Sequence, residues 1–384
     1  MLNLDFLVDF SDAINKKIMI GGSMKLWSNP NIRMYVPTDN SGKWRLLSLD
    51  TKKEYDVSSE VCLLISSFIE GNEVDEAENE LKSILKKNEI DLSGAILWLI
   101  SNGFLIESEA EYLEKMKLIE LWHDNGWFES LDYHLLTFNY PFENYSLDGD
   151  SNDIDVMHEY RMLDIEPSRT KLFENTLLAI SAPTSREACS KLTIDTLTIF
   201  SGSMLKNGLD KDRLLQLAAI TFGKLRHRKV ISGKKVEDLI RKTSPSGGCR
   251  HPSEGYFFCV DVIGIEPGCY HFSVSKNALI KVADLPTTEE MNIHFDGLNR
   301  SDFKPKAYAV MTSIFGRNMF RYREPRTFRT PFMDIGHLIA TMELTAQGLG
   351  ISTYTHHGIN DEFIESILRI NCLDESVVYG VALG

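Results

Sequence analysis

Residues 244–252 place the strongest constraint on the fold, because they read Ser-Pro-Ser-Gly-Gly-Cys-Arg-His-Pro and lead into the apolar run Tyr256-Phe257-Phe258. We call residues 244–252 the Ser-Gly-Gly loop. Its two glycines, Gly247 and Gly248, can adopt positive φ and expose bare backbone N–H groups. A flat or anionic ligand could therefore approach the main chain closely. A tight turn before a strand explains the same residues, so the loop alone leaves both interpretations open.

Length and charge limit the class of protein. The chain has 384 residues, which predicts two or three domains, and its net charge is −14. This acidity argues against a surface that follows nucleic-acid phosphates. No apolar run approaches the roughly 20 residues that span a bilayer. The N-terminus lacks a basic region followed by an apolar block, so we expect a cytoplasmic protein without a signal peptide or membrane segment.

The six cysteines form no Cys-x-x-Cys motif, and no histidine pair stands at zinc spacing. We therefore expect reduced, mostly buried thiols and no metal site. Cys249 lies in the Ser-Gly-Gly loop, where a small filler explains it better than a nucleophile because no base is evident beside it.

The first hundred residues follow a winged-helix-like pattern. Extended segments at 24–37 and 43–57 precede helices expected from Ser58 to Gly71, at 75–87 and at 91–102, and a short strand closes the segment at 104–106. The helix at 91–102 carries no lysine or arginine, which argues against DNA reading. Open strand edges favour capture of an extended peptide by strand addition.

The remaining chain divides into a connector and an α+β domain. Residues 108–145 are helical and then rich in aromatic residues, which favours interdomain packing, and Ser146 to Asp155 has the composition of a linker. Helices are expected at 210–222 and 332–347, and strands at 256–265, 306–315 and 377–383. We predict domains at 1–107, 108–170 and 171–384.

The N-terminal segment resembles the small peptide-recognition domain of enzymes that modify ribosomally made peptides. The resemblance lies in Lys43-Trp44-Arg45-Leu46-Leu47-Ser48-Leu49, in the helix from Ser58 and in the ending Asn102-Gly103-Phe104-Leu105-Ile106. It implies that this segment binds a leader peptide. A plain structural domain is the alternative.

The segment from about residue 120 to 384 resembles the SagB-type dehydrogenases of thiazole- and oxazole-containing peptides, within the FMN-dependent nitroreductase superfamily. Four blocks in the family's order carry this resemblance: Asp132-Tyr133-His134 with Thr137; residues 244–254; Phe320-Arg321-Tyr322-Arg323-Glu324 with Phe328-Arg329; and residues 333–338 with Ala346-Gln347-Gly348-Leu349-Gly350. It implies a nitroreductase-like α+β domain that forms a homodimer with FMN at the subunit interface.

The resemblance also assigns site residues. Backbone N–H groups and a guanidinium would stabilise the negative charge that a flavin gains on reduction. The predicted cofactor contacts are Ser244, Pro245, Ser246, Gly247, Gly248, Arg250, Arg317, Gly348 and Gly350. A surface salt bridge is the alternative role for Arg250, and a helix stop is the alternative for the Gly348–Gly350 turn.

The family's reaction oxidises an azoline ring to an azole with the help of a Lys-Tyr pair, which corresponds here to Arg321 and Tyr322. Arginine does not lose its proton under ordinary conditions, so Arg321 could position charge but is a poor base. Tyr322 is the predicted acid or base of the pair. An ordinary half-buried aromatic residue is the alternative for Tyr322.

A second difference concerns the cofactor phosphate. Relatives hold it with an arginine-rich block, whereas the corresponding stretch here is Ile194-Asp195-Thr196-Leu197-Thr198-Ile199-Phe200. Other cations would have to replace those arginines. The candidates are Arg226, Arg228, Arg317 and Arg329, of which the first two belong to the sequence Arg226-His227-Arg228-Lys229, expected as a basic turn.

These features predict an FMN-dependent dehydrogenase that oxidises azolines in a precursor peptide, with a leader peptide and a cyclodehydratase as partners. Two alternatives stay open. A flavin-dependent reductase would act on a nitro group or a dehydrated residue. A degenerate, non-catalytic domain would bind peptide or scaffold a complex, and the missing lysine and arginines favour this second alternative.

Overall fold

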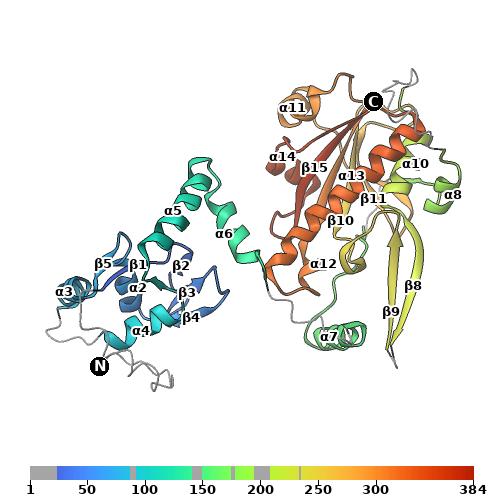
Figure 1. Ribbon diagram of the computed structural model, residues 1–384. Coiled ribbons are helices and arrows are strands. Elements are labelled where there is room, and N and C mark those ends of the chain that lie inside the picture. Colours follow the sequence, from blue (N-terminus) through green and yellow to red (C-terminus); the bar gives the residue numbers. More distant parts are fainter. Residues whose placement is uncertain (1–23, 87–91, 141–148, 174–177, 194–207, 233–234) are drawn as a thin grey trace. The chain divides into compact units, whose positions relative to one another are not determined.

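A computed structural model describes residues 24–86, 92–140, 149–173, 178–193, 208–232 and 235–384. The chain divides into an N-terminal unit, residues 1–141, and a C-terminal unit, residues 142–384. Within the described residues, each helix is too short or too polar to span a lipid bilayer. Figure 1 gives the element labels used below.

The N-terminal unit contains two small antiparallel sheets. One has the order β5-β1-β6, and the other has the order β2-β3-β4. The strands are β1 (Lys25–Ser28), β2 (Ile32–Tyr35), β3 (Trp44–Ser48), β4 (Glu54–Val57), β5 (Asn72–Glu73) and β6 (Leu105–Ile106). The turns between β2, β3 and β4 fall where the sequence places Gly42 and the polar residues 50–53.

Three helices pack on these sheets, and two more follow. They are α2 (Ser59–Ser66), α3 (Val74–Leu85), α4 (Ser93–Ser101), α5 (Glu109–Asp124) and α6 (Phe128–Thr137). Each helix expected in the first hundred residues is present, and the ends differ by a few residues. Leu26, Ile65, Phe68 and Phe104 form the centre of the core and are almost fully buried. Hydrophobic burial of this kind is the main stabilisation of a small domain.

A seven-stranded antiparallel sheet organises the C-terminal unit, with the order β14-β15-β13-β10-β11-β12-β7. The strands are β7 (Ala179–Ser181), β10 (Ser253–Cys259), β11 (Gly268–Ser273), β12 (Ala278–Ala283), β13 (Ala307–Ile314), β14 (Thr353–His356) and β15 (Glu375–Leu383). A separate hairpin is formed by β8 (Lys224–Ser232) and β9 (Lys235–Lys242).

Helices cover both faces of the seven-stranded sheet. The described helices of this unit are α7 (Gly149–Leu163), α8 (Ser185–Ser190), α10 (Lys211–Phe222), α11 (Thr288–His294), α12 (Phe315–Met319), α13 (Arg329–Leu349) and α14 (Asp361–Leu368). Helices α10 and α13 pack on one face, and α11 and α14 lie on the other. This mixture of helices with an antiparallel sheet confirms the predicted α+β class.

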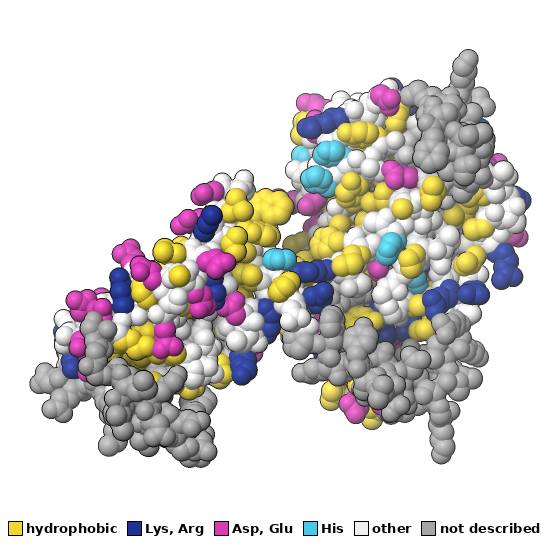
Figure 2. Space-filling model, viewed as in Figure 1, with side chains coloured by type: hydrophobic (Ala, Val, Ile, Leu, Met, Phe, Trp, Pro, Cys, Tyr) yellow, Lys and Arg dark blue, Asp and Glu magenta, His cyan; other side chains and the backbone are white. Residues whose placement is uncertain are grey.

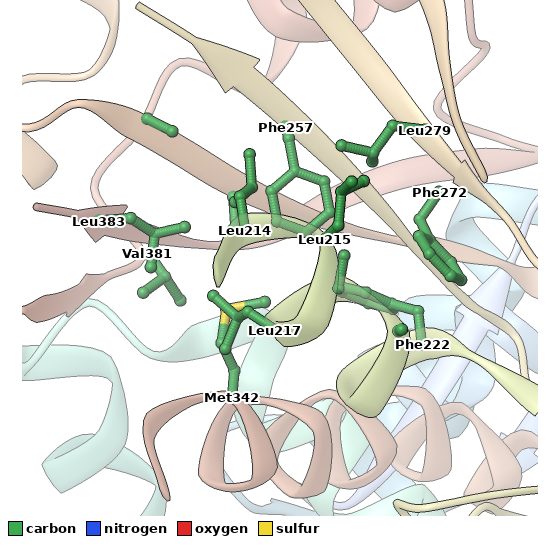
Figure 3. Packing of buried hydrophobic residues seen from close by; sticks show 14 of the residues in the cluster. Leu214, Leu215, Leu217, Phe222, Phe257, Phe272, Leu279, Met342, Val381 and Leu383 are labelled. Carbon is green, nitrogen blue, oxygen red and sulfur yellow. The ribbon is translucent and has the colours of Figure 1, made fainter. Parts of the chain in front are cut away.

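The core beneath α10 shows why Gly255 is needed in β10. Phe222 and Phe257 meet edge to face, with ring centroids 6.0 Å apart (Figure 3). A Cβ on Gly255 would stand 2.4 Å from the Phe222 ring. The strand therefore carries a glycine where the ring packs on the backbone.

Three expectations about elements were wrong. Helix α7 begins at Gly149 and replaces most of the predicted linker, and Arg226 to Lys229 lie in strand β8 rather than in a turn. The strand expected at 256–265 ends at Cys259.

The division into two units falls at 141/142, inside the segment predicted as a connector. Residues 194–200, matched above to the family's phosphate block, lie outside the described residues.

Candidate functional site

The Ser-Gly-Gly loop joins β9 to β10 and is fixed to helix α13 by side-chain hydrogen bonds. Ser246 Oγ donates to Asp334 Oδ2 at 2.6 Å, and the Gly247 N–H donates to Asp334 Oδ1 at 3.3 Å. Ser244 Oγ donates to Thr341 Oγ1 at 2.6 Å. The loop that the sequence singled out therefore has a definite shape, and two of its predicted ligand-binding donors already bind a carboxylate.

The backbone of this loop is unusual, because Gly248, Cys249 and His251 have φ of 55°, 54° and 49°. Positive φ costs a residue with a Cβ about 1–2 kcal/mol, so other contacts must hold Cys249 and His251 there. The His251 N–H donates to Ser246 Oγ at 2.9 Å, and its ring Nε2 lies 2.8 Å from the Ile240 carbonyl oxygen. Burial and then the Lys242 charge lower the pKa of His251 to about 3, so its ring is neutral.

Tyr322, the predicted acid or base, lies against the predicted cofactor loop. A Cβ built on Gly248 would stand 2.3 Å from the Tyr322 hydroxyl oxygen, and one on Gly247 would stand 2.7 Å from Thr330 Cγ2. Both glycines are thus required by close neighbours, and Gly248 is also required by its positive φ. The structure brings together two residue groups that are far apart in sequence.

Arg321 and Tyr322 form a stacked pair. The Arg321 guanidinium carbon lies 4.9 Å from the centroid of the Tyr322 ring, within the range of a cation–π contact. Arg321 is buried, with 5% of its surface exposed, whereas Tyr322 is half-buried. The guanidinium is therefore placed to stabilise negative charge beside Tyr322.

Arg250 forms a buried ion pair rather than the surface salt bridge weighed above. Its Nη1 lies 2.6 Å from Glu166 Oε1, and 4% of the residue is exposed. Burial alone raises the pKa of Glu166, but hydrogen bonds from Arg161 and Arg169 and the Arg250 charge lower it to about 2. Glu166 is therefore ionised at neutral pH and holds Arg250 toward the segment that follows α7.

Arg317 is also an interior residue. Its Nη1 lies 2.6 Å from Glu254 Oε1, both side chains are 2% exposed, and it donates to the backbone carbonyl groups of Ser168 and His251. Burial raises the pKa of Glu254, but the Arg317 charge and the His271 hydrogen bond outweigh it and lower the pKa to about 2. Arg317 thus fixes the end of the Ser-Gly-Gly loop, and direct contact with a cofactor stays a prediction.

The two remaining glycines end helix α13. Gly350 has φ of 70° and its N–H donates to the carbonyl of Gln347, which is the geometry of a left-handed helix cap. Gly348 lies inside the last turn of the helix. The helix end explains Gly350 fully, so its role beside a ring also stays a prediction.

Sequence reasoning missed Asp334, Glu166 and Lys242. Asp334 belongs to a quoted block without an assigned role, and it is 4% exposed. Lys242 lies two residues before the loop and is 9% exposed. An acid within a predicted buried helix was the available signal for Asp334, whereas nothing in the pattern of β9 indicated that Lys242 is buried.

The site fits the ring of a flavin at one place. Gly248 is exposed and has no side chain, so a flat ring could lie on its backbone next to the Tyr322 hydroxyl. The hydrogen bonds to Asp334 keep that backbone in one conformation, which lowers the entropy cost of binding. The phosphate end is less defined, since Arg226 is exposed on β8 while Arg250 and Arg317 have protein partners.

Residues 206–384 match the family model described as Nitroreductase family. The trifolitoxin-processing protein TfxB of Rhizobium leguminosarum bv. trifolii is 29% identical over 259 residues, which cover 65% of this chain and 68% of TfxB.

Two solved structures are similar to parts of this chain. A nitroreductase from Anabaena variabilis has a TM-score of 0.43 and 19% identity, covering 59% of this chain and 46% of its own. A chain from the E. coli microcin synthetase McbBCD complex with truncated pro-MccB17 has a TM-score of 0.38 and 18% identity. The match covers 60% of this chain and 92% of the microcin synthetase chain. This chain therefore spans less than half of the Anabaena protein.

FMN is the cofactor of the nitroreductase family, in agreement with the cofactor expected from the sequence. The α+β architecture and the family match over residues 206–384 are consistent with each other. The C-terminal unit of this chain is therefore similar, over residues 206–384, to the nitroreductase family.

Proposed function

We propose that this protein is an FMN-dependent oxidoreductase that matures a ribosomally made peptide by oxidising azoline rings to azoles. The observation that supports the proposal is the close approach of the Tyr322 hydroxyl to Gly248, because these are the residues proposed to transfer the proton and to carry the flavin ring. Similarity to TfxB, which processes trifolitoxin, supports a peptide substrate.

The reaction removes one proton and one hydride from the azoline ring. Bound FMN supplies the hydride acceptor. Tyr322 acts as the base in its phenolate form, takes the proton and becomes a neutral phenol. Arg321 stabilises that phenolate before the transfer, because a guanidinium keeps its own proton. Asp334 and Arg317 hold the Ser-Gly-Gly loop and take no part in proton transfer to the substrate.

The proposal includes a homodimer. Exposed apolar side chains cluster where α12 and α13 face solvent, and Figure 2 shows hydrophobic side chains gathered over the face that α13 crosses. They are Met319, Phe328, Phe332, Met333 and Leu344, which are between 45% and 57% exposed. A patch of this kind favours burial against a second copy, and Tyr322 follows α12 closely enough to lie near that interface.

The N-terminal unit is proposed to bind the leader segment of the substrate. Strands β2 and β4 are the outer strands of a three-stranded sheet, and an edge strand can pair with an extended peptide. A cyclodehydratase that makes the azoline would act before this enzyme in the cytoplasm. These partners follow from the resemblance of the sequence blocks and form part of the proposal.

An absorption spectrum of the purified protein tests the cofactor. We expect the visible bands of a flavin, and a colourless protein that fails to bind added FMN would refute the proposal. Incubating the flavin-bound protein with an azoline-containing peptide tests the reaction. Mass spectrometry should then detect the loss of two hydrogen atoms for each ring.

The pairing of Arg250 and Arg317 with carboxylates favours a second candidate. A non-catalytic domain that binds peptide would keep both ion pairs as internal structure and would need no phosphate contact. The flavin spectrum separates the two candidates, because only the oxidoreductase requires the cofactor.

A further inference from the structure

Lys242 is a buried lysine at the end of β9, two residues before the Ser-Gly-Gly loop. With 9% of its surface exposed, it lines a small cavity of about 10 Å³. Ser244, Ser246, His251, Ser253 and Asp334 provide the other polar walls of this cavity. A buried lysine needs compensation for the water that it loses.

Charged groups from three elements act on Lys242. They are Glu254 of β10, Arg317 of α12 and Asp334 of α13, with the neutral His251 ring beside them. Glu254 already binds Arg317 and His271. Asp334 is the second carboxylate that balances the Lys242 ammonium, after Glu254, which has the larger effect.

Asp334 is the residue that fixes the loop. Burial raises its pKa, while its hydrogen bonds with Ser246 and Gly247, and the charges of His337 and Lys242, oppose that rise. A cation close to Asp334 is therefore needed to keep the carboxylate ionised in the interior. Lys242, which lines the same cavity, contributes that positive charge.

The cavity has room for a single water molecule. Ser253 Oγ lines it and has no hydrogen-bond partner among the described residues, although Ser253 is only 3% exposed. Such a water would satisfy Ser253 and connect the Lys242 ammonium with the Asp334 carboxylate.

We propose that Lys242 and Asp334 are positioning residues that, bridged by one buried water, hold the Ser-Gly-Gly loop in its ligand-ready conformation while Lys242 is charged. The inference rests on the proposed function for its purpose, since the loop is the proposed ring-binding backbone. The arrangement itself is a property of the protein without ligand.

A dependence on pH follows. Burial is the main factor that lowers the pKa of Lys242 to about 8. Below this pH the ammonium balances Asp334, and above it Asp334 is left as a buried carboxylate with too little compensation. Because such a charge is costly, the carboxylate rehydrates and releases the Gly247 N–H.

Hydrogen exchange of the Gly247 amide tests this inference in the full chain without added flavin. Protection is measured by mass spectrometry from pH 6.5 to 9.5 and corrected for the intrinsic exchange rate. We expect protection of the peptide containing Gly247 to fall about tenfold, with a midpoint near pH 8. Constant protection across this range would overturn the inference.

Variants separate charge from packing. In Lys242→Met the Gly247 amide should be unprotected at every pH. In Lys242→Arg it should stay protected up to pH 9.5, because arginine keeps its charge. In Asp334→Asn the protection of this amide should no longer depend on pH. Lys224→Met is the matched control, because Lys224 is exposed and pairs with Lys242 across the hairpin. A Lys242→Met profile equal to the wild type would refute the role of Lys242.

If Lys242→Met fails to fold, the wild-type and Asp334→Asn profiles decide. The exchange experiment is done without flavin, so its result does not depend on whether the protein binds FMN. Failure to bind FMN would therefore refute the proposed function but not this inference. Conversely, a flavin-bound protein with a pH-independent Gly247 amide refutes this inference alone.

Discussion

The Tyr322 hydroxyl oxygen lies 2.3 Å from the position that a Cβ on Gly248 would occupy. Gly248→Ala therefore has to displace Tyr322, and it also forces a residue with a Cβ to adopt φ of 55°. We expect the variant to bind FMN at least tenfold more weakly, as measured by quenching of flavin fluorescence. Wild-type affinity in Gly248→Ala would contradict the close contact.

Gly94→Ala is the control for the effect of a methyl group as such. Gly94 lies in α4 of the N-terminal unit, has no atom within 4 Å of its Cβ position and has an ordinary φ. This variant should keep its flavin affinity and gain a few tenths of a kcal/mol in stability.

Tyr322→Phe tests the proton-transfer role, because it keeps the ring beside Arg321 and removes only the hydroxyl. We expect kcat for azoline oxidation to fall by about 10²–10⁴ while the flavin spectrum persists. Tyr270→Phe removes a hydroxyl that donates to the Glu266 carbonyl at 2.7 Å, so it controls for loss of a structural hydrogen bond. Unchanged azole formation in Tyr322→Phe would exclude the hydroxyl from the reaction.

Arg317→Met should be strongly destabilising, because it leaves Glu254 buried without its cation and frees the carbonyl groups of Ser168 and His251. We expect a loss of about 3–5 kcal/mol in the free energy of unfolding, measured by urea denaturation. Arg300→Met is the matched control, since the Arg300–Asp296 pair is more than 60% exposed and should contribute less than about 1 kcal/mol. Equal losses in both variants would contradict the interior role of Arg317.

The two depressed carboxylates predict sensitivity to acid. The pKa values of Glu166 and Glu254 are each lowered to about 2 from 4.5. The two carboxylates contribute fully to the free energy of unfolding above pH 4.5. This contribution is lost as the pH falls toward 2, because the unfolded chain then binds more protons than the folded protein. Urea midpoints measured between pH 7 and pH 3 should therefore decline below about pH 5.

Glu166→Gln should weaken this decline, because one of the two groups no longer titrates. The variant also loses the ion pair with Arg250, so its stability at pH 7 should be lower than that of the wild type. A variant with the full acid slope would show that Glu166 carries no depressed pKa in the folded protein.

The sequence predicted the elements that have strong periodicity or clear turn residues. Helix α13 was expected at 332–347 and spans Arg329–Leu349, and β13 and β15 were expected within two residues of their ends. The β8–β9 hairpin was missed, because its first strand reads Lys-Leu-Arg-His-Arg-Lys with no apolar alternation. Its pairing depends on backbone hydrogen bonds that the side-chain pattern does not reveal.

The sequence indicated the unusual backbone of the loop but not the partners of its charged residues. The Ser-Gly-Gly motif carries its conformational requirement in its own residues, so a sequence can indicate it. Arg250 and Glu166 stand 84 positions apart, and only the folded chain brings them together. The same holds for Asp334, whose contact with Ser246 gives the loop its shape.

The proposed homodimer predicts that a charge in the apolar patch prevents association. Phe332 is 45% exposed and meets Phe328 edge to face, with ring centroids 5.1 Å apart. Phe332→Asp would bury a carboxylate in the interface, so we expect light scattering to give the chain mass of 43.6 kDa, against twice that mass for the wild type. Ile293→Asp, at an exposed position of α11, should stay dimeric. A monomeric wild type, or a dimeric Phe332→Asp protein, would show that the patch does not hold two copies together.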